Sequence, residues 1–189
     1  VPAPAWPHEL AGLHYRQLEG MGAKELAYDK EHCYLYASIP ASAGREADPV
    51  LGFIAHMDTS PAVTGKDVKA RIVGQYDGGD IVLNPEKGIV LKVSDFPEIA
   101  SYKGKSLIVT DGTTLLGADD KAGVAEIMET AEYLLTHPEV SHGKIRIGFT
   151  PDEEIGAGAD HFDVELFGAD SGSTGDGAGG GGGDLEIFI

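Results

Sequence analysis

The sequence predicts an α/β fold in which helices cover a largely parallel β-sheet. Short apolar runs at 50–55 and 106–110 are typical of buried strands, and the run at 144–150 alternates, with Ile145, Ile147 and Phe149 on one side, as a strand does. A segment with helical spacing, 120–136, lies between the last two of these runs. Helices that alternate with apolar strands are the pattern of layered α/β domains, which is why we expect this fold class.

Two segments have the apolar spacing of amphipathic helices. The first, 7–22, can end at one of its two last glycines, and its expected buried face comprises Leu10, Leu13, Leu18 and Met21. The second, 120–136, stops before Pro138, which cannot continue a helix. Its apolar stripe comprises Val124, Ile127, Met128, Ala131, Leu134 and Leu135.

Residues 32–39 alternate along the chain, as a strand with two different faces does. One face would carry Cys33, Leu35, Ala37 and Ile39, and the other Tyr34 and Tyr36. Cys33 is the single cysteine, so an internal disulfide is excluded and a buried thiol is expected. Shorter strand candidates lie at 72–73, 81–83 and 89–91.

The last part of the chain has an unusual composition. Residues 171–183 are mostly Gly, Ser and Ala, with five consecutive glycines from Gly179, which is typical of a flexible linker. The run at 184–189 is strand-like, and we expect no partner strand for it in the chain. We therefore expect one domain over 1–170, followed by a linker and an unpaired strand.

The chain is acidic, with 31 Asp and Glu against 14 Lys and Arg and a net charge of −17. This charge disfavours nucleic acid or an anionic membrane as a partner. The sequence has no apolar run of 18 residues or more, and residues 1–4 lack the basic and apolar parts of a signal peptide. We expect a cytoplasmic protein, in which converging carboxylates could bind a cation.

Two pairs of polar residues flank the predicted elements. His56 and Asp58, two apart after a strand, would face one side, where imidazole could bind zinc and the carboxylate could orient it. Asp119 and Asp120 precede the second helix, and a carboxylate there could bridge two metal ions. Taken singly, a polar strand end and a helix cap are the stronger explanations. Lys121 is either a surface charge or a partner of one carboxylate.

A third pair, Glu153 and Glu154, follows the run at 144–150. Adjacent residues point in different directions, so one could bind a metal ion while the other acts as a general base. A solvated acidic turn is the ordinary alternative. The three pairs together are harder to explain by chance, because each supplies metal-binding atoms after a strand-like run. Together they predict metal-assisted hydrolysis.

Four motifs carry a resemblance to a known family. They are AHMDTSP at 55–61, GGDI at 78–81, LLGADDKAG at 115–123 and FTPDEEIG at 149–156. In content, order and spacing they resemble the peptidase T family, the tripeptide aminopeptidase branch of the M20 di-zinc metallopeptidases. The resemblance implies a three-layer α/β/α zinc-peptidase-like catalytic domain with a mostly parallel central sheet, truncated in this chain.

The resemblance also implies a role for each residue of the three pairs. His56 would bind one zinc ion and Asp58 would orient it. Asp119 would bridge the two zinc ions and precede a cis peptide bond. Glu153 would be the general base that deprotonates the bridging water, and Glu154 would bind the other zinc ion.

Two departures from the family pattern concern the remaining zinc ligands. Asp176 lies in STGDGA at 173–178, where the family has a stretch like YTVDGG, and it is the implied ligand there. The family's last ligand is a histidine far downstream in a longer chain. The expectation is therefore a partial catalytic domain over 1–170, with 171–189 beginning a missing lid or dimerisation region. Such a fragment would bind zinc weakly and turn over little substrate.

Three hypotheses for function follow. The leading one is a zinc-dependent aminopeptidase with two Zn²⁺ ions that hydrolyses the N-terminal peptide bond of tripeptides, with a homodimer through the missing domain left open. Another M20 hydrolase, a dipeptidase or amidohydrolase, is the alternative among enzymes. A non-catalytic metal-binding fragment or interaction module is the alternative from another class. The acidic stretch at 76–80 could hold a substrate ammonium group, although a solvated loop is the favoured explanation.

Overall fold

The computed structural model describes residues 5–174 and 185–187, and the chain forms two compact units. Unit 1 comprises Val1–Ser60 and Asp119–Gly177, and unit 2 comprises Pro61–Ala118 and Ala178–Ile189. In the described part of the chain, no helix combines the length and the apolar character that crossing a membrane requires. Each unit is described by itself below.

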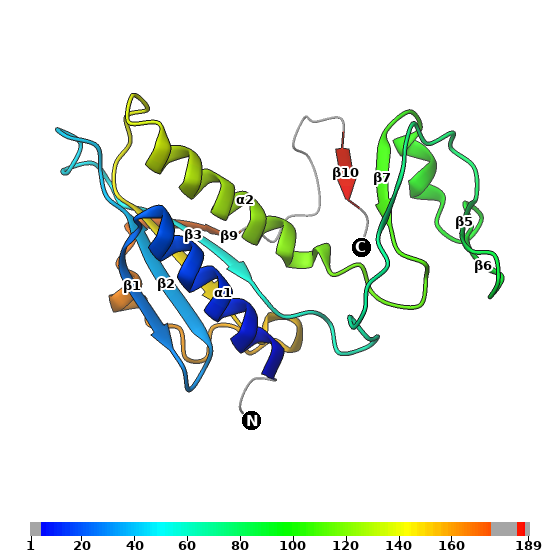
Figure 1. Ribbon diagram of the computed structural model, residues 1–189, viewed down its shortest axis with the longest axis horizontal. Helices are drawn as coiled ribbons and strands as arrows, with labels where there is room; N and C mark the ends of the chain where they lie inside the picture. The colour runs from blue at the N-terminus through cyan, green and yellow to red at the C-terminus, as the bar shows by residue number, and fades with distance from the viewer. Residues whose placement is uncertain (1–4, 175–184, 188–189) are drawn as a thin grey trace. The chain divides into compact units, whose positions relative to one another are not determined.

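Unit 1 is built on a five-stranded sheet in the order β1-β2-β8-β3-β9 (Figure 1). The strands are β1 (Lys24–Asp29), β2 (Tyr34–Ile39), β3 (Leu51–His56), β8 (Ile145–Thr150) and β9 (Ser171–Thr174). β3 pairs in parallel with β8 and β9, whereas β2 pairs antiparallel with β1 and β8. Four of the five strands therefore point in one direction, which confirms a mixed and mostly parallel sheet.

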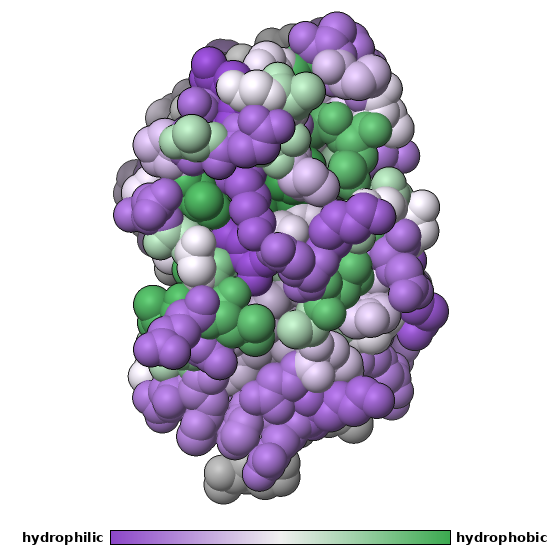
Figure 2. Space-filling view, turned by 90° about the vertical axis from the view of Figure 1, so that its left-hand side faces the viewer, coloured by the Kyte–Doolittle hydropathy of each residue, from purple (hydrophilic) through white to green (hydrophobic). Residues whose placement is uncertain are grey.

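Helices cover both faces of this sheet. α1 (Ala5–Met21) and α2 (Ala118–Thr136) lie on the same side, as Figure 1 shows, and pack with the sheet in one apolar core. The short helix α3 (Val164–Phe167) contributes Phe167 to a second cluster, with Tyr34 and Tyr36, on the opposite face. This arrangement confirms the three-layer α/β/α fold class. The face in Figure 2 is mainly hydrophilic, with small groups of hydrophobic side chains between the polar ones.

β2 has the two faces that its alternation predicts. Leu35, Ala37 and Ile39 lie in the core beneath α1 and α2, while the two tyrosines lie on the α3 side. Every residue of β2 is buried because both faces of the sheet are covered. Cys33, just before the strand, is a free and fully buried cysteine, and burial raises the pKa of its thiol to about 11. We therefore expect this thiol to be unreactive.

Two details of the predicted helices and strands are wrong. Leu13 of α1 is 43% exposed, whereas Ala11 and Leu18 are fully buried. Ala11 and Leu18 are two helical turns apart and share a face, while Leu13 lies far around the helix from both. The prediction also missed β1, an edge strand of mixed polarity whose pairing with β2 is irregular between Lys24 and Ala27.

The linker predicted over 171–183 is wrong for its first four residues. Ser171–Thr174 form β9 and pair with Leu51–Ile54 of β3. The edge of a sheet offers unpaired backbone donors and acceptors. Small side chains such as those of β9 do not prevent a strand from pairing with them. The Asp170 carboxylate also accepts a hydrogen bond from the backbone N–H of Val50 at 2.8 Å. The remaining linker residues, 175–183, lie outside the described part of the chain.

Unit 2 contains two small sheets and a 3₁₀ helix, η1 (Pro97–Tyr102). One sheet has the order β10-β7-β4, formed by β4 (Arg71–Val73), β7 (Ser106–Val109) and β10 (Leu185–Ile187). The other is a hairpin of β5 (Ile81–Asn84) and β6 (Ile89–Leu91). β10 pairs in parallel with β7, so the prediction of an unpaired final strand is wrong. Its partner lies far upstream, where the order of elements along the chain does not reveal it.

The close contact between Gly52 of β3 and Phe167 leads to a testable prediction. A Cβ atom at Gly52 would stand 2.6 Å from two ring carbons of Phe167. Gly52→Ala should therefore lower the free energy of unfolding by about 1–3 kcal/mol, because the ring must move. Urea unfolding measures this change. Gly20→Ala in α1 is the matched control, since a Cβ there meets nothing within 4 Å, and equal stability of the two variants would contradict this packing.

Candidate metal centre

The site lies at the edge of the sheet where β3 and β8 end. The two strands pair in parallel up to His56 and Thr150, so the segments that follow them start side by side. Glu153 and Glu154 begin the 3₁₀ turn η2 (Glu153–Ile155) just after β8, and Asp119 enters at the start of α2. The structure thus brings five of the predicted residues together: His56, Asp58, Asp119, Glu153 and Glu154. Asp176, the sixth, lies outside the described residues.

His56 is the centre of this group, and its side chain is only 2% exposed. Its Nε2 atom lies 2.9 Å from Oδ1 of Asp119 and 3.7 Å from Oε2 of Glu153. Its Nδ1 atom lies 3.3 Å from Oδ1 of Asp58 and 3.2 Å from the backbone oxygen of Asp58. Burial alone would lower the pKa of His56, but the bonds to Asp58 and Asp119 outweigh it and raise the pKa to about 9.

Asp58 links His56 to the two glutamates. Its Oδ1 atom accepts a hydrogen bond from the backbone N–H of Glu153 at 3.2 Å, and Oδ2 accepts one from the backbone N–H of Glu154 at 3.1 Å. Burial would raise the pKa of Asp58, but these bonds and the bond to His56 lower it below its usual value. Asp58 is therefore an ionised carboxylate that orients the imidazole on one side and the glutamate turn on the other.

Asp119 and Asp120 face different partners. Asp120 is 3% exposed, and its Oδ1 atom accepts a hydrogen bond from the backbone N–H of Gly123 at 3.1 Å, in the first turn of α2. The ordinary explanation of the pair, helix capping, therefore holds for Asp120. Asp119 instead directs Oδ1 toward His56. The peptide bond between the two aspartates is cis, as the resemblance implies.

Lys121 is a partly buried member of the site, and the sequence alone did not reveal its contacts. Its Nζ atom donates hydrogen bonds to the backbone oxygens of Asp58, at 2.8 Å, and Asp119, at 3.0 Å. Burial lowers the pKa of the ammonium group, while the surrounding carboxylates oppose this shift. Its acceptors are carbonyl groups, which no charge pattern in the sequence could indicate.

His56, Asp119 and Glu154 fit a divalent metal ion. One donor atom from each lies within 4.8 Å of the others. One imidazole nitrogen and two carboxylate oxygens are ligands that zinc accepts in proteins. Because Asp58 holds Nδ1 of His56, Nε2 is the nitrogen that faces the carboxylates. In 5–174 no second group of three His, Cys, Asp or Glu side chains converges in this way.

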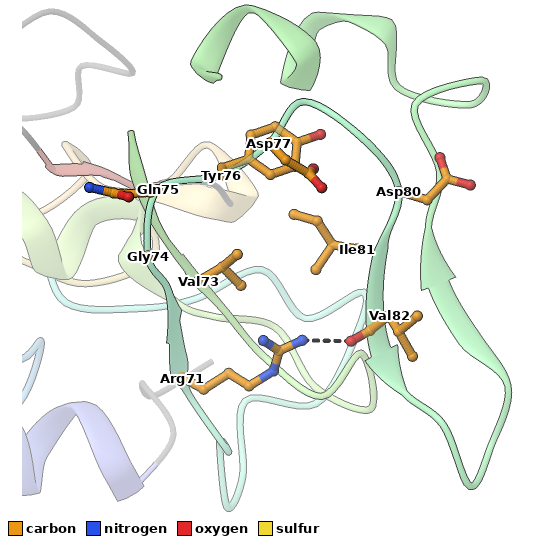
Figure 3. Close-up of a pocket in the computed structure, with 9 residues that line it drawn as sticks. All are labelled: Arg71, Val73, Gly74, Gln75, Tyr76, Asp77, Asp80, Ile81 and Val82. Carbon is orange, nitrogen blue, oxygen red and sulfur yellow. Dashed lines mark hydrogen bonds between the residues drawn. The ribbon is translucent and has the colours of Figure 1, made fainter. Parts of the chain in front are cut away.

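Unit 2 has a surface hollow of about 320 Å³ along the stretch 71–82, which includes the acidic stretch 76–80 but none of the residues predicted for the metal centre (Figure 3). The hydroxyl of Tyr76 donates to the backbone oxygen of Gly79 at 2.5 Å, and Asp77 accepts from the backbone N–H of Gly79 at 2.8 Å. Asp80 accepts from the backbone N–H of Val93 at 2.9 Å. These acids stabilise local turns, which favours the loop interpretation of 76–80.

Comparison with known proteins identifies relatives of this sequence. No protein-family model matches the chain. Peptidase T of Clostridium botulinum (strain Hall) is 53% identical over 188 residues, covering 100% of this chain and 46% of the relative. Peptidase T of Clostridium novyi (strain NT) is 60% identical over 162 residues, covering 86% of this chain and 39% of the relative. This chain is homologous to peptidase T. It spans less than half the length of these relatives.

Solved structures show the same fold. Aminopeptidase PepT from Bacillus cereus is 27% identical with a TM-score of 0.65, over 90% of this chain and 38% of that protein. A tripeptidase from Staphylococcus aureus is 26% identical with a TM-score of 0.60, over 89% of this chain and 37% of that protein. The chain therefore has the α/β fold of part of these peptidases.

Proposed function

We propose that the protein carrying this sequence is an M20-family peptidase, a zinc-dependent aminopeptidase that releases the N-terminal residue of tripeptides in the cytoplasm. The observation that carries the proposal is the convergence of His56, Asp119 and Glu154 within 4.8 Å, beside Glu153. Homology to peptidase T supports peptide hydrolysis. The names of the similar structures, an aminopeptidase and a tripeptidase, support the choice of substrate.

We assign the metal-binding roles to four residues of a partial catalytic domain over 1–170 and the segment after it. His56 and Glu154 would each hold one of two zinc ions, Asp119 would be shared between them, and Asp176 is proposed as a further ligand. Bound zinc would supply Lewis-acid chemistry, lowering the pKa of water and polarising the carbonyl of the scissile bond.

Glu153 is the proposed general base. Its side chain is 47% exposed, so water and a peptide can reach it, while Asp58 holds its backbone N–H. In the proposed reaction the Glu153 carboxylate accepts the proton of the attacking water and then donates it to the departing amine. Asp58 contributes by keeping His56 and the turn at Glu153 and Glu154 in fixed orientation.

Removal of the metal tests this proposal. Dialysis of the protein that carries this sequence against a chelator should abolish release of N-terminal amino acids from tripeptides, because the polarisation of the carbonyl is assigned to the metal ion. Return of Zn²⁺ should restore the activity, measured by chromatography of the products. If metal analysis finds no bound zinc and hydrolysis nevertheless persists, the proposal is contradicted. Dipeptides and N-acylated amino acids, assayed in parallel, distinguish a tripeptidase from a dipeptidase or an amidohydrolase.

A further inference from the structure

We propose that Asp120 and Lys121 are positioning residues that hold the segment 56–58 against the start of α2. They would thereby set the distance between His56 and Asp119 before any metal ion binds. The inference rests on the proposed function, because it concerns the donors of the proposed metal centre. Neither positioning residue belongs to the group of donors that converges there.

Both ends of the segment 56–58 are bonded to these two consecutive residues. The backbone N–H of His56 donates to Oδ2 of Asp120 at 3.3 Å. The backbone oxygen of Asp58 accepts a hydrogen bond from Nζ of Lys121 at 2.8 Å. Each end of the segment 56–58 is therefore hydrogen-bonded to a residue at the start of α2.

The middle of the segment is fixed to a different element. Met57 is fully buried, and its backbone N–H donates to the backbone oxygen of Thr150, the last residue of β8, at 2.8 Å. With both ends and the middle bonded, a change at one contact would alter the direction of the His56 ring and of the Asp58 carboxylate. Those two groups determine the geometry of the proposed site.

Lys121 also joins the two halves of the donor set. Its Nζ atom donates to the backbone oxygen of Asp119 at 3.0 Å as well as to that of Asp58, which is 63 residues away from Lys121 in the sequence. One ammonium group thus bonds both Asp58, which contacts Nδ1 of His56, and Asp119, which faces Nε2 of His56. Asp119 lies 2.9 Å from His56, and we expect this distance to increase when the shared contact is lost.

Electrostatics gives Lys121 a second role. Five carboxylates occupy this edge of the sheet: Asp58, Asp119, Asp120, Glu153 and Glu154. Like charges this close repel one another, most strongly where water is excluded. Lys121 places a cation with three N–H donors among them. In the metal-free protein this cation opposes the separation of the segment that carries Asp58 from the segment that carries Asp119.

Lys121→Met tests the proposal, because it removes the ammonium group and keeps an unbranched side chain of similar length. The 189-residue chain is first measured with a chelator present, by residue-resolved amide hydrogen exchange. We expect faster exchange at His56, Glu153 and Glu154 than in the wild type. The wild type and Lys121→Met are then titrated with Zn²⁺ by calorimetry. The zinc dissociation constant of Lys121→Met should be about 10- to 100-fold higher, the usual loss of affinity when a group that orients a ligand is removed.

Lys144→Met is the matched control. Lys144 is a partly buried lysine of the same unit that pairs with Glu25 at 2.6 Å, away from the segment 56–58. It should leave exchange at His56, Glu153 and Glu154 at the wild-type rate. Asp120→Asn is the second variant, and it should speed exchange at the His56 amide, whose acceptor it alters. It keeps the proposal testable if Lys121→Met does not fold.

Wild-type exchange at His56 in the folded variants would overturn the proposal. A wild-type zinc dissociation constant in Lys121→Met would overturn it as well, because a purely structural role lowers stability without weakening metal binding. Failure of the wild-type chain to bind Zn²⁺ counts against the proposed function instead, and the exchange rates measured without metal then decide the positioning role alone.

Discussion

Glu153→Gln is expected to lower the rate of tripeptide hydrolysis by about 10²- to 10⁴-fold, the usual contribution of a general base. Glutamine keeps the size of the side chain but cannot accept the proton of water. The backbone N–H of residue 153 should still donate to Asp58, so the turn that carries Glu154 should stay in place. The turnover number, measured with saturating peptide and zinc, is the quantity to compare.

Zinc content distinguishes this prediction from loss of the site. Glu153→Gln should bind as much zinc as the wild type, because the converging donors are His56, Asp119 and Glu154. His56→Ala is the contrasting variant and should lose metal and activity together. Retention of wild-type turnover by Glu153→Gln would remove Glu153 from the proposed mechanism and leave the proposed ligands untouched.

Arg146→Met should lower the free energy of unfolding of unit 1 by about 3–5 kcal/mol, because two backbone carbonyl groups lose a charged donor. Arg146 is 3% exposed, and its guanidinium donates to the backbone oxygens of Phe167, at 2.6 Å, and Leu166, at 2.7 Å. It also donates to Oε2 of Glu25 at 2.5 Å. Methionine would fill most of the space but leave two carbonyl groups without this donor. Urea unfolding in the absence of metal measures the loss.

Lys144→Met is an informative comparison for this variant, because Lys144 binds the same Oε2 atom of Glu25 at 2.6 Å. Lys144 is 35% exposed, and pairs near the surface contribute about 0–1 kcal/mol. The two variants should therefore differ by at least about 2 kcal/mol. Similar stabilities would show that the bonds from Arg146 to the end of α3 contribute little.

The sequence was sufficient to predict that His56, Asp119 and the two glutamates converge. β3 and β8 are apolar and end in polar residues, and parallel strands bring their carboxyl ends to the same edge. His56 and the glutamates could therefore be placed together before their contacts were known. The two faces of β2 were equally predictable, because a period of two assigns each side chain to one layer.

Other features depend on contacts that local patterns do not contain. The spacing of Asp119 and Asp120 could not tell which would cap α2 and which would face His56. β9 and β10 were misjudged because their partners lie far away in the sequence and use backbone atoms. Arg146 reads as the solvent side of an alternating strand, yet the α3 layer covers it.

The long sequence separations within the site have a kinetic consequence. Asp58 and Glu153 are 95 residues apart, and His56 and Asp119 are 63 residues apart. Closing such loops is slow compared with forming helices or hairpins, and a site of this kind cannot exist until β3 and β8 have paired along their length. A metal-sensitive signal during refolding should therefore develop after most helical signal has returned. The appearance of this signal would then report that the central sheet has formed.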